Sequence, residues 1–365
     1  MRRYLRFIVL FVLTALVLWW FGRDLDWAAV RAAVGQSDWW LIATAVALVC
    51  VTYFVRALRW RVLLAPLAET SLRELFAATT VGFGALFLVG RVSEVVRPAF
   101  LSLRDPRVRP AAAFVTIGVE RIYDLVTVVL LFAVNLIWFR APGSDPAAYT
   151  RVRQAGIVLA IGAVIGIAAL IWFRRNAPPL LNWLGRKMAG ARPLVKRAGR
   201  LLIGLLEQVA QALSVLTDAR GLAKTVGWTA VLWSLIAVAN WLVFYAFGLR
   251  FGISETLFVL GWALVGSLVP TPGGAAGAFH AATAAGLVFL GVVVEQAAAV
   301  SIILHLVVFG PAVFFGLYYF LRSDVSLARI KSLVSDENKE GTRRVEESPA
   351  AAGELALKEK KVSVP

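Results

Sequence analysis

The stretch SIILHLVVFGPAVFFGLYYFL, residues 301–321, decides the fold, because it contains no aspartate, glutamate, lysine or arginine. A run of about 20 predominantly apolar residues is long enough to cross the hydrocarbon core of a bilayer as a helix. A second run of this kind, FIVLFVLTALVLWWF, covers residues 7–21. Across all 365 residues, 60% of the side chains are hydrophobic and the mean hydropathy is +0.77. Soluble domains are only about half apolar, so the sequence predicts an all-α polytopic membrane protein.

Apolar segments recur along most of the chain, and we expect them to supply six to eight transmembrane helices. They lie near residues 5–21, 39–55, 75–90, 111–139, 154–173, 226–247, 256–293 and 297–321. No small-residue cleavage motif follows the first segment, so we expect a retained helix rather than a cleaved signal peptide. Residues 1–321 are expected to form one transmembrane domain. Residues 322–365, charged and poor in aromatic side chains, are expected to form a disordered cytoplasmic tail.

The formal net charge of +16 would suit a nucleic-acid binder, but the positions of the basic residues argue against one. They cluster at the ends of apolar segments, where lysine and arginine orient a membrane protein and meet anionic lipid. Arginines at positions 2, 3 and 6 precede the first segment, so we expect cytoplasmic termini and a multi-pass protein of the bacterial plasma (inner) membrane. Cys50 is the single cysteine, which excludes an intrachain disulfide.

Residues 174–225 are predicted to be a basic cytoplasmic region within the transmembrane domain. Eight lysines and arginines, and no acidic residue, lie between Arg174 and Arg200. Residues 202–216 then carry leucine and valine at helical spacing, opposite polar side chains. We predict an amphipathic helix that either lies on the cytoplasmic surface of the membrane or packs against other cytoplasmic segments.

The apolar segment 75–90, LFAATTVGFGALFLVG, is difficult to place as a single crossing, because five arginines and only two acidic residues follow it. They are Arg91, Arg97, Arg104, Arg107 and Arg109, with Glu94 and Asp105. A single crossing would put these arginines outside, against the usual distribution of positive charge. We therefore predict a re-entrant hairpin that bends at Gly82 and Gly84, the alternative being one crossing that violates this rule.

The apolar segment 256–293 is interrupted by VPTPGGAAGAFHAATAAG, residues 269–286. Prolines remove backbone donors and glycines loosen a helix, which is costly where no water can satisfy the backbone. We predict that one half-helix stops here and another starts, at the tip of a second hairpin that enters from outside; two crossings are the alternative. One hairpin from each side is typical of the inverted repeats in secondary transporters.

Three charged residues lie inside an apolar segment, where burying a charge costs free energy. Glu120, Arg121 and Asp124 fall inside the apolar segment 111–139, where an unpaired charge costs at least about 2.5–3.5 kcal/mol. Glu120 and Asp124 are four residues apart and share a helix face. They predict either an ion pair with the arginines of residues 91–97 or a path for a substrate or proton, and the two are compatible.

Two further groups could bind an anion. Arg91, Glu94 and Arg97 are three residues apart, so on a helix they line one face. Their forked guanidinium groups suit a phosphate, the alternative being ordinary cytoplasmic-side arginines. The glycine-rich backbone before His280 presents unpaired N–H groups at the start of a helix. We expect His280 to be a neutral hydrogen-bonding group rather than a fixed cation.

Four motifs occur in the order RALRWRVLL, GRVSEVVRP, VERIYD and PTPGGAAGAFH. Together they resemble the flippase-like transmembrane family of lysylphosphatidylglycerol synthases, over roughly residues 5–321. The resemblance implies a two-hairpin bundle. Members fused to a synthase translocate aminoacylated phosphatidylglycerol, and stand-alone members are assigned to lipid or glycolipid translocation. This chain looks like a stand-alone member without the soluble synthase domain, so we do not expect it to make lysylphosphatidylglycerol.

The resemblance also implies which residues bind or translocate the substrate. They are Arg91, Glu94, Arg97, Glu120, Arg121, Asp124, Pro270, Pro272, Gly273, Gly274 and Gly277. We add His280 as a candidate of this chain's own, with Arg56 and Arg59 as secondary candidates. The chain departs from the family pattern at His280, where a glutamate is common, and by one extra alanine between the glycines. This departure puts in doubt any mechanism that needs a carboxylate there.

We expect a lipid flippase or transporter that moves an anionic phospholipid or glycolipid headgroup across the membrane. The sequence has no G-x-x-x-x-G-K-[ST] loop, so ATP is not the expected driver. One alternative is an integral-membrane lipid-modifying transferase in which Glu120 or His280 acts as a base. The other is a non-catalytic membrane partner of a separate lipid synthase or glycosyltransferase.

The sequence gives no reason to expect an enzyme, a metal or a cofactor. The two histidines, His280 and His305, are 25 residues apart, and no cluster with metal-ligand spacing accompanies them. The expected partners are membrane lipids, either an anionic phospholipid or a lipid-linked sugar. Nucleic acid is not expected as a partner, and an oligomer remains open.

Overall fold

The computed structural model describes residues 12, 14–65, 67–89, 95–139, 146–189, 219–269, 272–326 and 329. Every regular element within them is a helix. The helices are α2 (Trp27–Gly35), α3 (Trp39–Leu64), α4 (Leu72–Val89), α5 (Val96–Arg104), α6 (Pro110–Trp138), α7 (Pro146–Ala189), α9 (Ala219–Ala246), α10 (Ile253–Gly266), α11 (Pro272–Ala275), α12 (Ala278–Phe289) and α13 (Val294–Leu321).

Three of the described helices are long and apolar enough to cross a membrane, and they are Trp39–Leu64, Arg220–Ala246 and Val294–Leu321. Shorter apolar helices accompany them, including Ile253–Gly266 and Gly273–Phe289. The all-α class is confirmed within the described residues. The number of crossings, predicted as six to eight, stays a prediction.

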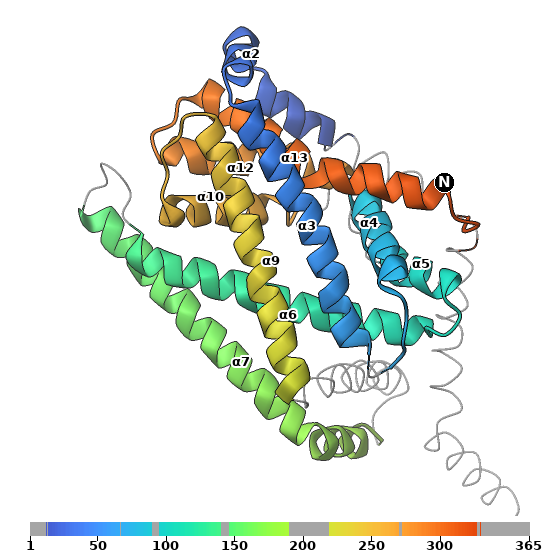
Figure 1. Cartoon of the computed structure of the whole chain (residues 1–365). Coiled ribbons are helices and arrows are strands. Elements are labelled where there is room, and N and C mark those ends of the chain that lie inside the picture. Colours follow the sequence, from blue (N-terminus) through green and yellow to red (C-terminus); the bar gives the residue numbers. More distant parts are fainter. Residues whose placement is uncertain are drawn as a thin grey trace, which may run out of the picture.

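Helices α3 and α9 run side by side along their length (Figure 1). The backbone N–H of Asp38 donates to the carbonyl of Ala246 at 2.9 Å, which joins the start of α3 to the end of α9 and makes the pair antiparallel. Asp38 also caps α3, because its carboxylate accepts from the N–H groups of Trp40 and Leu41. The sequence placed the end of this helix at residue 55, but α3 continues to Leu64.

Helices α4 and α5 form an antiparallel pair, so the chain reverses between them, but the predicted bend at Gly82 and Gly84 is wrong, because both glycines lie inside the continuous helix α4. Near the start of α4, Glu74 accepts a 2.8 Å hydrogen bond from Arg104 at the end of α5. Farther along α4, a Cβ on Gly82 would lie 2.5 Å from Cβ of Arg97 near the start of α5. The start of α4 thus lies beside the end of α5, and the later part of α4 lies beside the start of α5. Residues 90–94, between the two helices, lie outside the described residues, and the re-entry of this hairpin into the membrane stays a prediction.

A second antiparallel pair, α10 and α12, has the same form. A Cβ on Gly266 would lie 2.6 Å from the carbonyl oxygen of Ala278, while the rings of Phe258 and Phe289 lie 5.3 Å apart at the other end. The chain between the two helices contains the short turn α11, so the predicted break in residues 269–286 is present. In Figure 1 the two pairs lie on opposite sides of α3.

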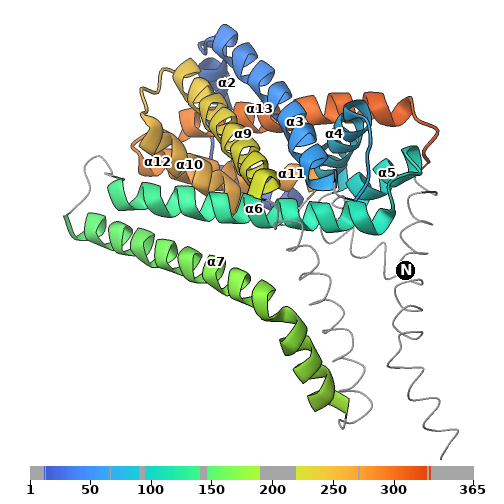
Figure 2. The same cartoon turned by 60° about the horizontal axis from the view of Figure 1, so that its bottom comes forward.

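Helix α7 is longer than the predicted segment 154–173 and packs against α6 (Figure 2). Residues 174–189 continue this helix, and residues 219–225 begin α9. The described ends of the predicted cytoplasmic region 174–225 are therefore parts of two long helices. A membrane helix can extend into water in this way, because its backbone hydrogen bonds are made within the helix. Residues 190–218, including the predicted amphipathic helix, lie outside the described residues.

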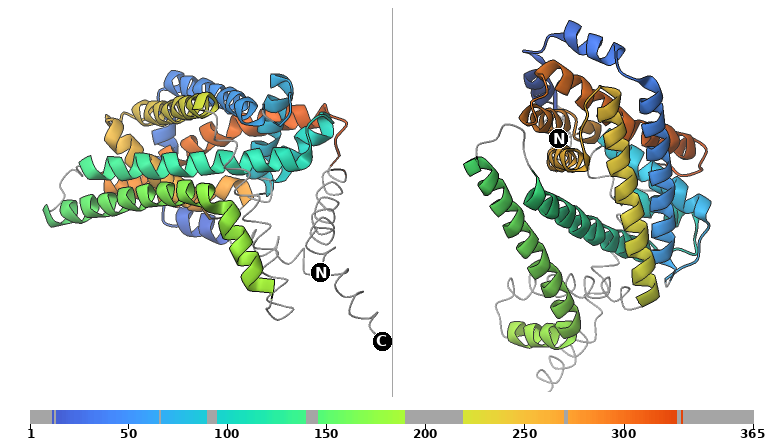
Figure 3. Two further views of the ribbon diagram at one scale, coloured as in Figure 1. Left: turned by 90° about the horizontal axis from the view of Figure 1, so that it is seen from below. Right: turned by 60° about the vertical axis from the view of Figure 1, so that its left-hand side comes forward.

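Helix α13 passes through the middle of the fold and crosses α4 at very short range (Figure 3). A Cβ on Gly316 would lie 2.6 Å from the carbonyl oxygen of Thr80, and one on Gly84 would lie 2.9 Å from the carbonyl oxygen of Ala312. Small residues at such crossings let two backbones approach closely, as is common between membrane helices. The crossing fixes the first hairpin against the centre of the protein.

We predict that Gly316→Ala destabilises the protein, because its methyl group would force the α4 backbone away from α13. Overpacking of this kind costs about 1–3 kcal/mol. Gly310→Ala on the same helix is the matched control, since a Cβ at Gly310 would meet nothing within 4 Å. The measurement is the thermal unfolding midpoint in detergent. Equal midpoints for the two variants would contradict the close crossing.

Asp105 ends the first hairpin and lies outside the long apolar helices. Its carboxylate accepts hydrogen bonds from Nε and Nη2 of Arg107, each at 2.8 Å, and from the Thr70 hydroxyl at 2.6 Å. The hydrogen bonds from Arg107 hold the pKa of Asp105 at about 2, below its ordinary 3.8. A depressed pKa in the folded state adds stability that is present above the unfolded pKa and lost as the pH falls through the folded one.

We predict that Asp105→Asn lowers the thermal unfolding midpoint at pH 5, and that the difference from the parent protein shrinks as the pH falls from about 4 to 2. Glu69→Gln, which alters an exposed carboxylate in the same region, should show no such pH-dependent difference. The prediction fails if the gap between parent and Asp105→Asn is the same at pH 2 as at pH 5.

Candidate functional site

Arg59 of α3 is the centre of a buried charge cluster. Its guanidinium group binds both oxygens of Asp124, with Nη1–Oδ1 at 2.7 Å and Nη2–Oδ2 at 3.1 Å. Nη2 also lies 3.0 Å from Oε1 of Glu120, and Nη1 lies 3.2 Å from the Thr229 hydroxyl. The side chains of Arg59 and Glu120 have no solvent exposure. This single arginine therefore connects α3 with α6 and α9.

The two carboxylates reach Arg59 because of their spacing on α6. Glu120 and Asp124 are one helical turn apart, as the sequence indicated, and both face α3. Planar guanidinium groups and carboxylates make forked contacts of this kind, which are stronger than hydrogen bonds between neutral groups. The cluster offsets the cost of placing these charges inside an apolar helix.

Arg97 of α5 joins the same cluster from the first hairpin. Its Nη1 donates to Oε1 of Glu120 at 2.9 Å, so the predicted pairing of Glu120 with residues 91–97 is present. The guanidinium lies 4.1 Å from the ring centroid of Trp60, whose Nε1 donates to the hydroxyl of Thr116. Nε and Nη2 of Arg97 are buried and lack a hydrogen-bond partner among the described residues.

Two further arginines lie beside the cluster, and both approach the ring of Phe83. The guanidinium of Arg56 lies 4.7 Å and that of Arg121 5.9 Å from the ring centroid. Their closest carboxylate oxygens belong to Asp124, at 3.9 and 3.8 Å. The described cluster thus contains four guanidinium groups and two carboxylates, a formal net charge of +2. Arg91 and Glu94 lie outside the described residues, so their predicted shared face is not tested.

The tip of the second hairpin is an unusual backbone turn. Gly273, Gly274 and Ala275 all have left-handed conformations, with φ of 75°, 63° and 62°. Glycine adopts this conformation at little cost, whereas alanine is strained there. A fourth positive φ, 84°, occurs at Gly277, directly before α12. Pro270 lies outside the described residues, and Pro272 begins α11.

The two histidines, separate in the sequence, are in contact at this tip. The ring centroids of His280 and His305 lie 4.6 Å apart. The N–H of Gly277 donates to Nδ1 of His280 at 3.3 Å, so that nitrogen accepts a bond as the predicted neutral group would. Nε2 of His305 lies 3.2 Å from the carbonyl oxygen of Gly274 and must donate, because a carbonyl only accepts.

The two hairpins approach each other at α13. Phe87, near the end of α4, lies 5.8 Å from the ring of His305 and 6.0 Å from Phe309. A Cβ on Gly274 would contact the ring of Phe309 at 3.0 Å. Helix α11 also packs directly against α4. The glycine-rich turn thus lies against the inner end of the first hairpin, although the inverted repeat itself stays a prediction.

Sequence reasoning underestimated Arg59 and missed His305. Arg56 and Arg59 follow the predicted end of an apolar segment, so they resembled cytoplasmic arginines and ranked as secondary. The usable signal was their spacing of three in RALRWRVLL, where apolar residues continue to Leu64. For His305, the signal was a histidine in an otherwise uncharged transmembrane run. Its neighbour His280, by contrast, was predicted and lies at the tip.

We predict that Arg59→Gln destabilises the protein strongly, because it removes the buried guanidinium group that lies 2.7 Å from Asp124 and 3.0 Å from Glu120. Breaking a buried ion pair from one side costs about 3–5 kcal/mol. Arg61→Gln is the control, since Arg61 lies in the same turn of α3 and is exposed. Denaturant unfolding of the purified variants provides the comparison, and similar midpoints for both would rule out a structural role for Arg59.

Comparisons with known proteins agree with the apolar, helical character of the chain. The family profile described as "Lysylphosphatidylglycerol synthase TM region" matches residues 7–316. The chain is also similar to Glycosyltransferase AglD of Haloferax volcanii, with 24% identity over 330 residues. That match covers 80% of this chain and 50% of AglD, so the chain spans half the length of this curated relative. No solved structure matches the chain. With its apolar helices, the chain is a multi-pass membrane protein that belongs to the lysylphosphatidylglycerol synthase TM region family.

Proposed function

We propose that the protein moves a lipid with an anionic headgroup, a phospholipid or a glycolipid, across the cytoplasmic membrane without direct use of ATP. The observation that carries the proposal is the excess of positive charge around Arg59. Four guanidinium groups share two carboxylates, and two nitrogen atoms of Arg97 have no hydrogen-bond partner among the described residues. Charged groups inside a membrane protein are costly and are characteristic of substrate paths.

A phosphate or carboxylate fits this cluster chemically. Arginine presents planar, forked donors that match the oxygen atoms of an anion, and its charge persists at all physiological pH values. A dianion would neutralise the formal charge of +2, and a monoanion would halve it. Its oxygen atoms would also satisfy the unused nitrogen atoms of Arg97. The same attraction would be weak in water and is strong in a buried site.

The headgroup would need an opening to reach these donors, because Arg59 and Arg97 are almost completely buried. Arg97 belongs to the first hairpin, whose α4 contacts the glycine turn of the second. The backbone N–H groups of that turn and neutral His280 would supply a second polar contact farther along the path. A headgroup could then pass between two polar positions without crossing bare hydrocarbon.

A second candidate is a non-catalytic membrane module that assists a separate glycosyltransferase or lipid synthase. The similarity to half of Glycosyltransferase AglD favours it, since that protein combines a region like this chain with further sequence. In this case the cluster would hold a lipid for an enzyme rather than carry it across. Transport by the purified chain alone separates the two candidates.

We predict that Arg97→Ala abolishes transport and that Arg97→Lys restores only part of it, because lysine cannot reproduce a forked contact with phosphate. The assay follows fluorescent phosphatidylglycerol in liposomes that contain the purified protein, using a membrane-impermeant quencher of the outer leaflet. Arg61→Ala on α3 is the matched control, since that arginine is exposed and outside the cluster. Each variant must elute as a folded protein.

The outcomes are distinct. Faster scrambling than protein-free liposomes, lost in Arg97→Ala and kept in Arg61→Ala, supports transport through the cluster. Full activity of Arg97→Ala would assign the cluster to folding alone. Lipid that binds the parent protein without crossing would favour the accessory module.

A further inference from the structure

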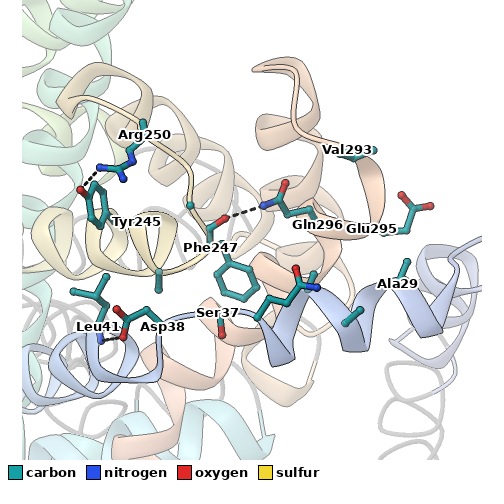
Figure 4. A pocket seen from close by; sticks show the side chains of 15 residues that line it. Ala29, Ser37, Asp38, Leu41, Tyr245, Phe247, Arg250, Val293, Glu295 and Gln296 are labelled. Atoms are coloured by element: carbon teal, nitrogen blue, oxygen red, sulfur yellow. Dashed lines mark hydrogen bonds between the residues drawn. The ribbon is translucent and has the colours of Figure 1, made fainter.

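A cavity of about 780 Å³ opens at the end of the protein opposite the Arg59 cluster (Figure 4). Three connections that are distant in sequence form it: the link from α2 to α3, the link from α9 to α10, and the link from α12 to α13. Two contacts hold these links together. The N–H of Asp38 donates to the carbonyl of Ala246, and the Gln296 amide donates to the carbonyl of Phe247 at 2.9 Å. Pockets for small molecules in proteins measure about 300–1,000 Å³.

The cavity lies at the level where a membrane surface is expected. Trp39 and Trp40 follow Asp38 directly and are exposed, and Trp241 lies one turn before Tyr245 in α9. Exposed tryptophan and tyrosine gather at the boundary between membrane and water. Arg59 lies about 30 Å farther along α3 at the usual helical rise. The cavity is therefore a separate feature, at the other surface from the charge cluster.

The lining offers both hydrogen-bond donors and acceptors. Asp38 and Glu295 present carboxylates from two sides, and Gln36 presents an amide. Arg250 lies over the ring of Tyr245, 4.5 Å from its centroid, and bonds the tyrosine hydroxyl. In Figure 4 the Tyr245–Arg250 pair and Glu295 lie at opposite ends of the cavity. The charged lining residues sum to −1.

This lining disfavours simple ions of either sign. A phosphate would bind Arg250 but would be repelled by the two carboxylates, and an ammonium group would bind the carboxylates but would be repelled by Arg250. A hydroxyl group both donates and accepts hydrogen bonds, so several hydroxyls can satisfy the carboxylates, the amides and the guanidinium together. The ring of Tyr245 adds an apolar face with a polar edge.

We propose that this cavity binds a hydroxyl-rich group, a sugar or a similar polyol, at the membrane surface opposite the Arg59 cluster. The group could come from a free sugar in solution or from the headgroup of a glycolipid, since the chemistry is the same. Binding here does not require lipid transport, so the proposal stands or falls separately from the proposed function.

The test uses protection of a cysteine placed in the cavity. Val293 lines the cavity and is 66% exposed, so Val293→Cys in a Cys50→Ala background reports occupancy through its rate of reaction with an impermeant maleimide. The full chain is held in lipid nanodiscs. The probes are maltose, glycerol phosphate and ethanolamine, together with nanodiscs that contain a diglucosyl lipid. We expect maltose or the diglucosyl lipid to slow the reaction, and the two charged probes to have little effect.

Two substitutions, one that removes a negative charge and one that removes a positive charge, distinguish a polyol site from an ion site. A polyol makes hydrogen bonds to both ends of the cavity, so Glu295→Gln and Arg250→Leu should each weaken protection by about five- to tenfold. Glu69→Gln, which changes an exposed acid elsewhere, should have no effect. Protection by the diglucosyl lipid alone assigns the site to a lipid headgroup, and protection by maltose as well shows that the sugar suffices.

Other results would overturn the proposal. An anion site would lose affinity in Arg250→Leu and gain it in Glu295→Gln, and an ammonium site would show the reverse. Protection by glycerol phosphate or ethanolamine but not by the sugars would exclude a polyol site. So would the absence of protection by any probe in folded Val293→Cys protein.

Discussion

The rest of the structure depends on the neutralisation of Arg59 inside a helix that is apolar enough to cross a membrane. A buried guanidinium group cannot remain unpaired, because removing its hydration costs several kcal/mol. Its partners must come from neighbouring helices, and they do: two carboxylates from α6 and a hydroxyl from α9. Glu120 then brings in Arg97 from α5. One buried charge thereby determines which helices are neighbours around it.

Backbone contacts organise the other part of the fold. Glycines occur where α4 meets α5, where α4 crosses α13, and where α10 meets α12, and a side chain at any of these positions would collide with a neighbour. The hydrophobic effect contributes little to the association of helices within a membrane. Close packing at small residues supplies the attraction instead. The two antiparallel pairs are therefore positioned by shape, while α6 is attached to α3 and α5 both by charge and by apolar packing. The glycine turn at the second tip packs against α4 and lies beside Phe309 of α13.

Local chemistry made several of these features predictable from the sequence. Apolar runs identified the long helices but not the short helices α2 and α5. The spacing of Glu120 and Asp124 identified their shared face, and Pro272 with two glycines identified the break before α12. Arg59 was harder to judge from the sequence. An arginine at a cytoplasmic helix end and an arginine buried within a helix look alike until the partner carboxylates on α6 are known. The contact between His280 and His305 depends on how α12 packs on α13, which no local pattern encodes. The cavity beside Glu295 is assembled from three loops and has no sequence signature.

The mixed character of these contacts has a thermodynamic consequence for α6. An anion that binds Nη1 or Nη2 of Arg59 would compete with Glu120 and Asp124 for these nitrogen atoms, whereas it would leave the glycine contacts of α4 with α5 and α13 untouched. Each carboxylate that is displaced removes one attachment of α6 to its neighbours. Ligand occupancy and the loosening of α6 are then linked equilibria, and linkage is reciprocal. A ligand that loosens α6 also binds more tightly whenever α6 is already displaced. The charge cluster would then both bind the headgroup and hold α6 against its neighbours while the headgroup is absent.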